Sequence, residues 1–123
     1  MKKDPITKSF GYAFEGIINT VKCERNMKIH CAFVVAVVVC GFIFRISYTE
    51  WLICLTLFGL VTSLELVNTA VESVVDLVTE EHKPLAKRAK DAAAGAVLIA
   101  AIFAAIIGLI IFVPKPFIML GII

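Results

Sequence analysis

The segment Ser63–Asp76, "SLELVNTAVESVVD", decides how the rest of the sequence is interpreted, because it places acidic side chains inside an apolar chain. Glu65, Asn68, Glu72 and Asp76 recur there at spacings of three and four residues. At about 100° per residue of an α-helix, these side chains share one narrow stripe, and valines and leucines cover the remaining surface. A charge at mid-bilayer costs several kcal/mol, so the stripe must face protein, water, a metal ion or a cationic group.

The composition on both sides of this segment is typical of an integral membrane protein. The chain has 123 residues, of which 60% are hydrophobic, and its mean hydropathy is +0.95, which excludes an ordinary soluble domain. Three segments approach the roughly 20 apolar residues that a membrane-spanning helix needs. We expect one all-α domain over residues 1–123, with spans at about 29–46, 50–76 and 86–113.

The segment before the first span is predicted to form an amphipathic surface helix over residues 5–27. Asp4 and Pro5 suit a helix start, with a capping carboxylate followed by proline at the first helical position. Apolar side chains then recur at helical spacing: Ile6, Phe10, Ala13, Phe14, Ile17 and Val21. This pattern favours a helix in the headgroup region, with a groove on a soluble partner as the alternative.

Basic residues predict the orientation of the chain. Of the 12 lysines and arginines, all but Arg45 and Lys115 precede the first span or lie between the second and third. The positive-inside rule then places the N-terminus and the loop at 77–91 in the cytoplasm, with the C-terminus outside. Membrane topology explains why the lysines and arginines cluster in these segments. We therefore expect no nucleic-acid partner.

Three interpretations of the acidic stripe remain open from the residues alone. The first is a solvated extension of the helix, which fits Glu65 poorly because that residue lies only about 21 Å beyond Trp51. The second is a proton- or cation-coupled transporter that uses the acids as a relay. The third is an enzyme at the membrane boundary, whose carboxylates hold a divalent cation and provide a base.

Two further features favour the enzyme. The run "KRAKD" at Lys87–Asp91 puts cations beside the carboxylates, which suits a nucleoside triphosphate, although no Walker loop is present. A transporter needs access from both faces of the membrane. The segments expected in the outer half, Val34–Phe44 and Trp51–Leu60, contain no charged residue.

Several motifs together resemble the prokaryotic diacylglycerol kinase family. They are "ExxNTAxExxxD" at Glu65–Asp76, "AKD" followed by "AAGAVL", and "ERN" ahead of the first span. Within the family, "YAFEGI" and "ERNMKIH" are similar to the Gram-positive branch, which phosphorylates undecaprenol more than diacylglycerol. The resemblance implies a homotrimer of three-span subunits in the bacterial inner membrane. Its activity would transfer the γ-phosphoryl group of Mg·ATP to a lipid hydroxyl at the cytoplasmic face.

The resemblance also implies roles for individual residues. Glu65 matches the general base that takes the proton of the lipid hydroxyl, and Asn68 matches a polar residue that helps to hold the site. Glu72, with Glu24 from "ERN", matches the pair that binds the divalent cation bridging the ATP phosphates. Asp76 matches a further acid of the site.

Other matched positions concern the nucleotide and the lipid. Lys90 matches a phosphate contact and Asp91 a contact to the adenine end. The remaining residues that the resemblance puts near ATP are Tyr12, Glu81, His82 and Lys83. Ala94 stands on the lipid side where the diacylglycerol branch has a serine, and this difference disfavours diacylglycerol as the preferred substrate. For His30 we expect a place at the membrane interface, with a place in the site as the alternative.

Overall fold

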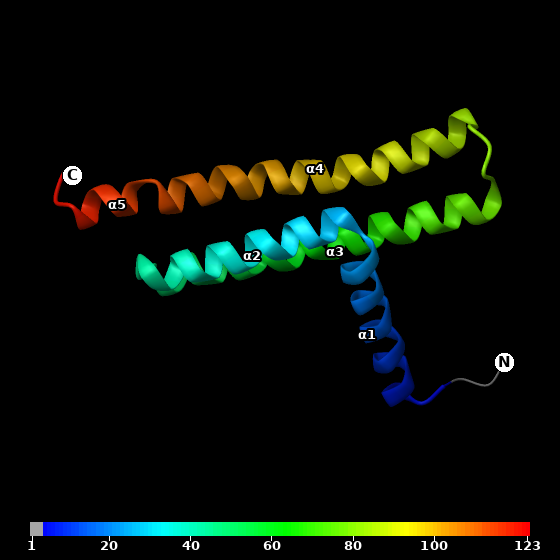
Figure 1. Ribbon diagram of the computed structural model, residues 1–123, viewed down its shortest axis with the longest axis horizontal. Coiled ribbons are helices and arrows are strands. Elements are labelled where there is room, and N and C mark those ends of the chain that lie inside the picture. Colours follow the sequence, from blue (N-terminus) through cyan, green and yellow to red (C-terminus); the bar gives the residue numbers. More distant parts are fainter. Residues whose placement is uncertain (1–3) are drawn as a thin grey trace.

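Short breaks in helical geometry divide the chain into five helices within residues 4–123, the part that this computed structural model describes. The helices, drawn in Figure 1, are α1 (Ile6–Cys23), α2 (Arg25–Ile43), α3 (Tyr48–Val78), α4 (Pro84–Phe112) and α5 (Pro114–Met119). Among the described residues, three helical stretches are long and apolar enough to cross a membrane: Arg25–Ile43, Tyr48–Val78 and Pro84–Met119. The prediction of an all-helical, multi-pass membrane protein is therefore confirmed.

The N-terminal helix is shorter than expected and starts differently. It ends at Cys23 rather than at 27, because Glu24 has extended backbone angles and separates α1 from α2. The prediction that Asp4 caps the helix is wrong. Pro5 is itself extended, with ψ 151°, so it occupies the cap position, and no side chain caps the helix. Lys2 and Lys3, which contributed to the predicted orientation, lie outside the described residues.

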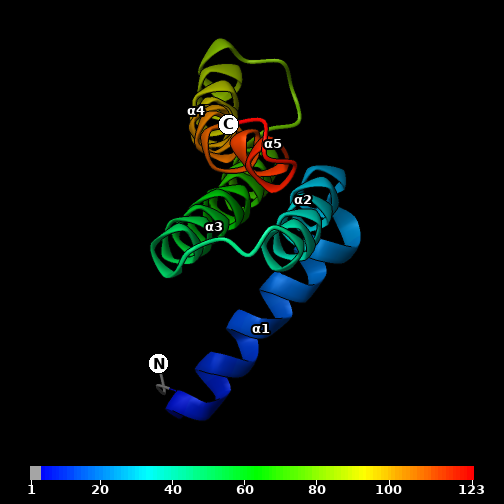
Figure 2. The same ribbon diagram turned by 90° about the vertical axis from the view of Figure 1, so that its left-hand side faces the viewer.

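The three long helices run side by side, while α1 leaves them at a steep angle. Figure 1 shows α3 and α4 as an antiparallel pair joined at one end, with α2 beside α3. Both α2 and α4 pack on α3. Figure 2 shows α1 projecting away from this bundle, and most of its side chains are exposed. Phe10 and Phe14, for example, keep more than half of their surface exposed.

One end of the bundle, which we name the Trp51 end, is closed by apolar packing. Ile46, Cys54 and Ile111 form a buried cluster there, with Trp51 and others packed around it. The ring of Trp51 lies so close to Gly41 that a Cβ atom at Gly41 would be only 2.6 Å from its Cη2 atom. A residue with a side chain therefore cannot replace Gly41 unless Trp51 moves.

Polar groups at the Trp51 end satisfy one another. Ser47 and Glu50 form a capping box at the start of α3, in which each side chain accepts a hydrogen bond from the other residue's backbone N–H. Lys115 of α5 pairs with Glu50 at 2.9 Å. The short helix α5 follows the expected end of the third span and thus ties the C-terminal segment to the start of α3.

Candidate active site

The acidic stripe of α3 passes from the protein interior to solvent along its length. Glu65 is 1% exposed and Asn68 is 5% exposed, whereas Glu72 is half-buried and Asp76 is exposed. Residues at helical spacing thus share one face, as the periodicity predicts. The solvated-extension interpretation suits Asp76 but not the two buried residues.

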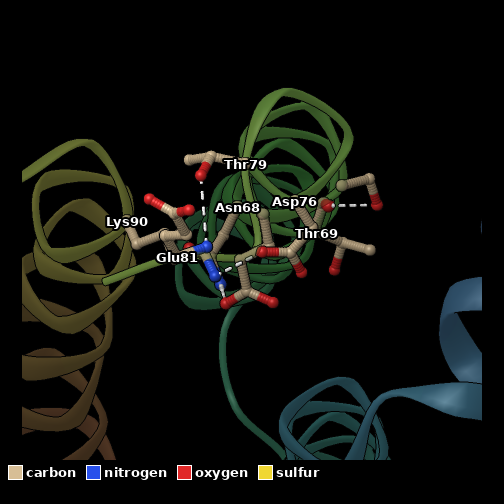
Figure 3. A network of polar contacts seen from close by, with 8 residues as sticks. Asn68, Thr69, Asp76, Thr79, Glu81 and Lys90 are labelled. Carbon is tan, nitrogen blue, oxygen red and sulfur yellow. Dashed lines mark hydrogen bonds and ion pairs between the residues drawn. The ribbon is translucent and has the colours of Figure 1, made fainter. Parts of the chain in front are cut away.

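Hydrogen bonds hold the middle of the stripe. Asn68 Nδ2 donates to Glu72 Oε1 at 3.2 Å, and the hydroxyl of Thr69 donates to the backbone carbonyl of Glu65 at 3.1 Å. Figure 3 shows this polar network along α3, with Asn68, Thr69 and Asp76 labelled. The Asn68 amide thus fixes one oxygen of the Glu72 carboxylate. A carboxylate has about four acceptor positions, so this hydrogen bond leaves capacity for another ligand.

Two acceptor atoms of the stripe lack partners. Within residues 4–123, Glu65 Oε2 and Asn68 Oδ1 are buried and accept no hydrogen bond. A buried polar atom without a partner costs about 1–3 kcal/mol, and more when it is charged. Such atoms call for a specific explanation, and a catalytic role, a bound water and a bound ion are the usual ones.

The side chain of His30, on α2, faces the carboxylate of Glu65. His30 Nε2 lies 3.6 Å from Glu65 Oε2, and the histidine side chain is 19% exposed. From the sequence we expect His30 at the membrane interface or in the site, and the sequence did not pair it with Glu65. A lone histidine within an otherwise uncharged, apolar stretch of α2 was the available signal.

A second group of predicted residues gathers where α3 turns into α4. A pocket of about 250 Å³ lies there. The predicted site residues that line it are Asp76, Glu81, His82, Lys83, Lys90 and Asp91. One ion pair joins the two helices, because Lys90 of α4 pairs with Asp76 of α3. Within the connection, the backbone N–H of Glu81 donates a hydrogen bond to the hydroxyl of Thr79. Figure 3 shows both contacts.

The structure does not bring every predicted residue to this pocket. Tyr12 on α1, Glu24 at the junction of α1 and α2, Glu72 and Ala94 are absent from its lining. Nowhere in the described chain do three acidic, histidine or cysteine side chains gather as a metal-binding group. The pairing of Glu24 with Glu72 therefore stays a prediction. Carboxylates nevertheless suit Mg²⁺, which usually takes one or two of them and completes its shell with phosphate oxygens and water.

An apolar groove runs between the three long helices. It encloses about 520 Å³ between α2, α3 and α4, and its lining includes Val61, Ala104 and Gly108. His30 is among its few polar lining residues. The imidazole thus lies between this groove and the buried carboxylate of Glu65.

These features define a class: a multi-pass membrane protein with a buried polar stripe beside a charged pocket at one end of its bundle. The profile of the family described as "Prokaryotic diacylglycerol kinase" matches residues 11–112. The chain therefore belongs to the prokaryotic diacylglycerol kinase family, and it is a membrane lipid kinase, for which the family implies ATP as co-substrate. Membership of a kinase family supports the interpretation of the stripe as an enzyme site over the interpretation as a transporter relay.

Individual relatives support the assignment over most of the chain. The undecaprenol kinase of Bacillus subtilis (strain 168) is 54% identical over 108 residues, which cover 88% of this chain and 88% of that protein. A diacylglycerol kinase of Synechocystis is 45% identical over 101 residues, covering 81% of this chain and 58% of the relative. The diacylglycerol kinase of Escherichia coli (strain K12) is 34% identical over 105 residues, which cover 82% of this chain and 83% of that protein.

Proposed function

We propose that this protein transfers the γ-phosphoryl group of Mg·ATP to the hydroxyl of undecaprenol at the cytoplasmic face of the bacterial inner membrane. The observation that carries the proposal is the buried carboxylate of Glu65, which lies on a stripe that leads to a charged pocket. The substrate class is supported by 54% identity to a protein named undecaprenol kinase.

In this proposal Glu65 is the general base. Its carboxylate takes the proton of the lipid hydroxyl while the hydroxyl oxygen bonds to the γ-phosphorus, and the bond from that phosphorus to the β,γ-bridging oxygen breaks to release ADP. Burial suits the role, because a base shielded from bulk water keeps its acceptor lone pair for the substrate. Asn68, which donates a hydrogen bond to Glu72, is proposed to help hold the site.

The charged pocket is proposed to receive the nucleotide. Lys90 would contact phosphate oxygens and Asp91 the adenine end, with Glu81, His82 and Lys83 lining the site. Lys90 pairs with Asp76 in the structure, so nucleotide phosphates would compete with Asp76 for the ammonium group. Tyr12 on the exposed helix α1 is proposed to approach ATP from the membrane surface.

Glu72 and Glu24 are the proposed ligands of Mg²⁺. The support is chemical, since carboxylate oxygens are the ligands that this ion prefers, and Asn68 occupies only one acceptor position of Glu72. Bound Mg²⁺ would neutralise charge on the phosphates during transfer. The two turns between Glu72 and Glu65 separate metal ligand from base by about 10 Å along the axis, a gap that long side chains narrow.

The proposed assembly is a homotrimer with α1 in the headgroup region. Its N-terminus and the α3–α4 connection would face the cytoplasm, and its C-terminus would lie outside. The exposed apolar side chains of α1 and of the long helices support contact with lipid or with other subunits, Phe14 and Phe103 among them. Ala94, exposed on α4, would face the lipid substrate.

The test is a direct assay of transfer. Purified protein is incubated with γ-labelled ATP, Mg²⁺ and either undecaprenol or diacylglycerol in mixed micelles, and labelled lipid is quantified. We expect label on both lipids and a higher kcat/KM for undecaprenol. A higher kcat/KM for diacylglycerol would favour the second candidate, a diacylglycerol kinase, which the 45% identical relative supports. No labelled lipid with either substrate would refute the proposal.

A further inference from the structure

The pair formed by His30 and Glu65 joins two spans at the most buried point of the polar stripe. His30 belongs to α2 and Glu65 to α3, and their facing atoms, Nε2 and Oε2, are 3.6 Å apart. The Glu65 side chain is almost fully enclosed, whereas the His30 side chain reaches the apolar groove. Thus His30 borders both the carboxylate and the groove.

His30 is placed where it can supply the hydrogen bond that the Glu65 carboxylate lacks. Within the described chain, Oε2 of Glu65 accepts no hydrogen bond, although it is shielded from solvent. The separation from Nε2 exceeds the usual limit of a nitrogen–oxygen hydrogen bond, about 3.2 Å, by a few tenths of an ångström. A small side-chain rotation would let an imidazole N–H donate to this oxygen and satisfy it.

Side-chain donors of the stripe and of α1 form hydrogen bonds with other acceptors. The Asn68 amide donates to Glu72, and the Thr69 hydroxyl donates to the Glu65 backbone rather than to its side chain. On α1, the buried hydroxyl of Thr20 donates to the carbonyl of Gly16. Among residues 4–123, His30 is the one histidine, lysine or arginine within ion-pair distance of Glu65.

From this geometry we infer that His30 is the positioning residue of Glu65, an inference that rests on the proposed function of Glu65 as the base. The Nε2–H of His30 donates to Glu65 Oε2 and fixes the orientation of the carboxylate. The second oxygen is then free to take the proton of the lipid alcohol. His30 acts only through Glu65, so its loss lowers the rate of transfer without weakening nucleotide binding.

The test compares variants of His30 that differ in their ability to donate. His30→Phe keeps a ring but removes the donor, and we expect it to lower kcat about a hundredfold, the usual effect of a reacting group displaced by about 1 Å. His30→Gln keeps an N–H near the position of Nε2, and we expect it to recover most of the rate. KM for ATP should stay unchanged in both variants. Cys31→Ala, the next residue of α2, serves as the control and should retain wild-type kcat.

A double-mutant cycle separates positioning from a general structural role. In the background of Glu65→Gln, His30→Phe should cost no further activity, because the group that it positions is already lost. The inference is overturned if His30→Phe has normal kcat, if His30→Gln is as impaired as His30→Phe, or if the two losses multiply. It is also overturned if His30→Phe lowers only the midpoint of thermal unfolding. Wild-type protein that labels no lipid would overturn the proposed function as well, whereas normal turnover by His30→Phe would leave that function standing.

Discussion

The two ends of the helical bundle satisfy their polar groups in opposite ways. At the Trp51 end, Glu50 accepts from the backbone of Ser47 and pairs with Lys115, and an apolar cluster fills the space between the helices. Toward the other end, which we name the Lys90 end after the residue that pairs with Asp76, the buried Glu65 lacks a partner for one oxygen. An unpaired buried acceptor lowers stability. Within residues 4–123 such acceptors lie toward the Lys90 end and not at the Trp51 end, and this difference separates a structural end from a functional one.

The largest effect that this comparison predicts is at Glu65. Glu65→Gln preserves shape but removes the basic oxygen, so we expect kcat for lipid phosphorylation to fall about 10²- to 10⁴-fold. Initial rates with γ-labelled ATP measure the loss. Glu50→Gln makes the same chemical change at the Trp51 end and should leave kcat near the wild-type value. Equal losses in both variants would remove the distinction between the ends.

The next effect concerns Glu72, the proposed metal ligand. Glu72→Gln keeps an acceptor for the Asn68 amide but weakens the hold on Mg²⁺, and we expect the affinity for Mg·ATP to fall at least about tenfold, or 1.4 kcal/mol. Titration of nucleotide binding at several Mg²⁺ concentrations measures it, and excess Mg²⁺ should restore part of the affinity. Unchanged affinity at all concentrations would rule out the metal role.

A smaller effect is expected at Lys90. Its ammonium group is partly exposed and paired with Asp76, so water and counter-ions screen its contribution. Lys90→Met should raise KM for ATP about fivefold, which corresponds to about 1 kcal/mol, the net value of one hydrogen bond. Arg88→Met, on the same helix but outside the pocket lining, is the control. A rise of equal size in both variants would point to general surface charge instead of a specific contact.

The smallest effect on activity should come from the Trp51 end, although stability changes there. Gly41→Ala forces a Cβ against the Trp51 ring, and overpacking of this kind costs about 1–3 kcal/mol. We expect a lower midpoint of thermal unfolding in detergent and a kcat per folded molecule close to wild type. Gly59→Ala, where no atom lies within 4 Å of the added Cβ, should not lower the midpoint. A reversed order of the two midpoints would contradict this packing.

What the sequence could predict follows from local geometry. The stripe of Glu65, Asn68, Glu72 and Asp76 depends only on helical periodicity, and because α3 is helical throughout this segment the four residues share one face. The gathering of residues around the α3–α4 connection is equally local, because a short loop brings the ends of two helices together. These relationships need no knowledge of how distant helices pack.

What the sequence could not predict depends on packing between helices. The contact of His30 with Glu65 is fixed by how α2 sits along α3, and that position follows in part from the fit of Trp51 against Gly41. Helix periodicity carries no such information. Likewise, the sequence could not predict the break at Glu24 that shortens α1, because no proline or glycine stands at that position.

The central claim is that the stripe divides into a base for the lipid and a ligand for the metal-bound nucleotide. The most direct measurement is the affinity of the Glu65→Gln protein for Mg·ATP, determined beside that of Glu72→Gln. The account predicts that Glu65→Gln binds Mg·ATP within a factor of about two of wild type while its lipid phosphorylation is lost. A loss of nucleotide affinity as large as that of Glu72→Gln would contradict it.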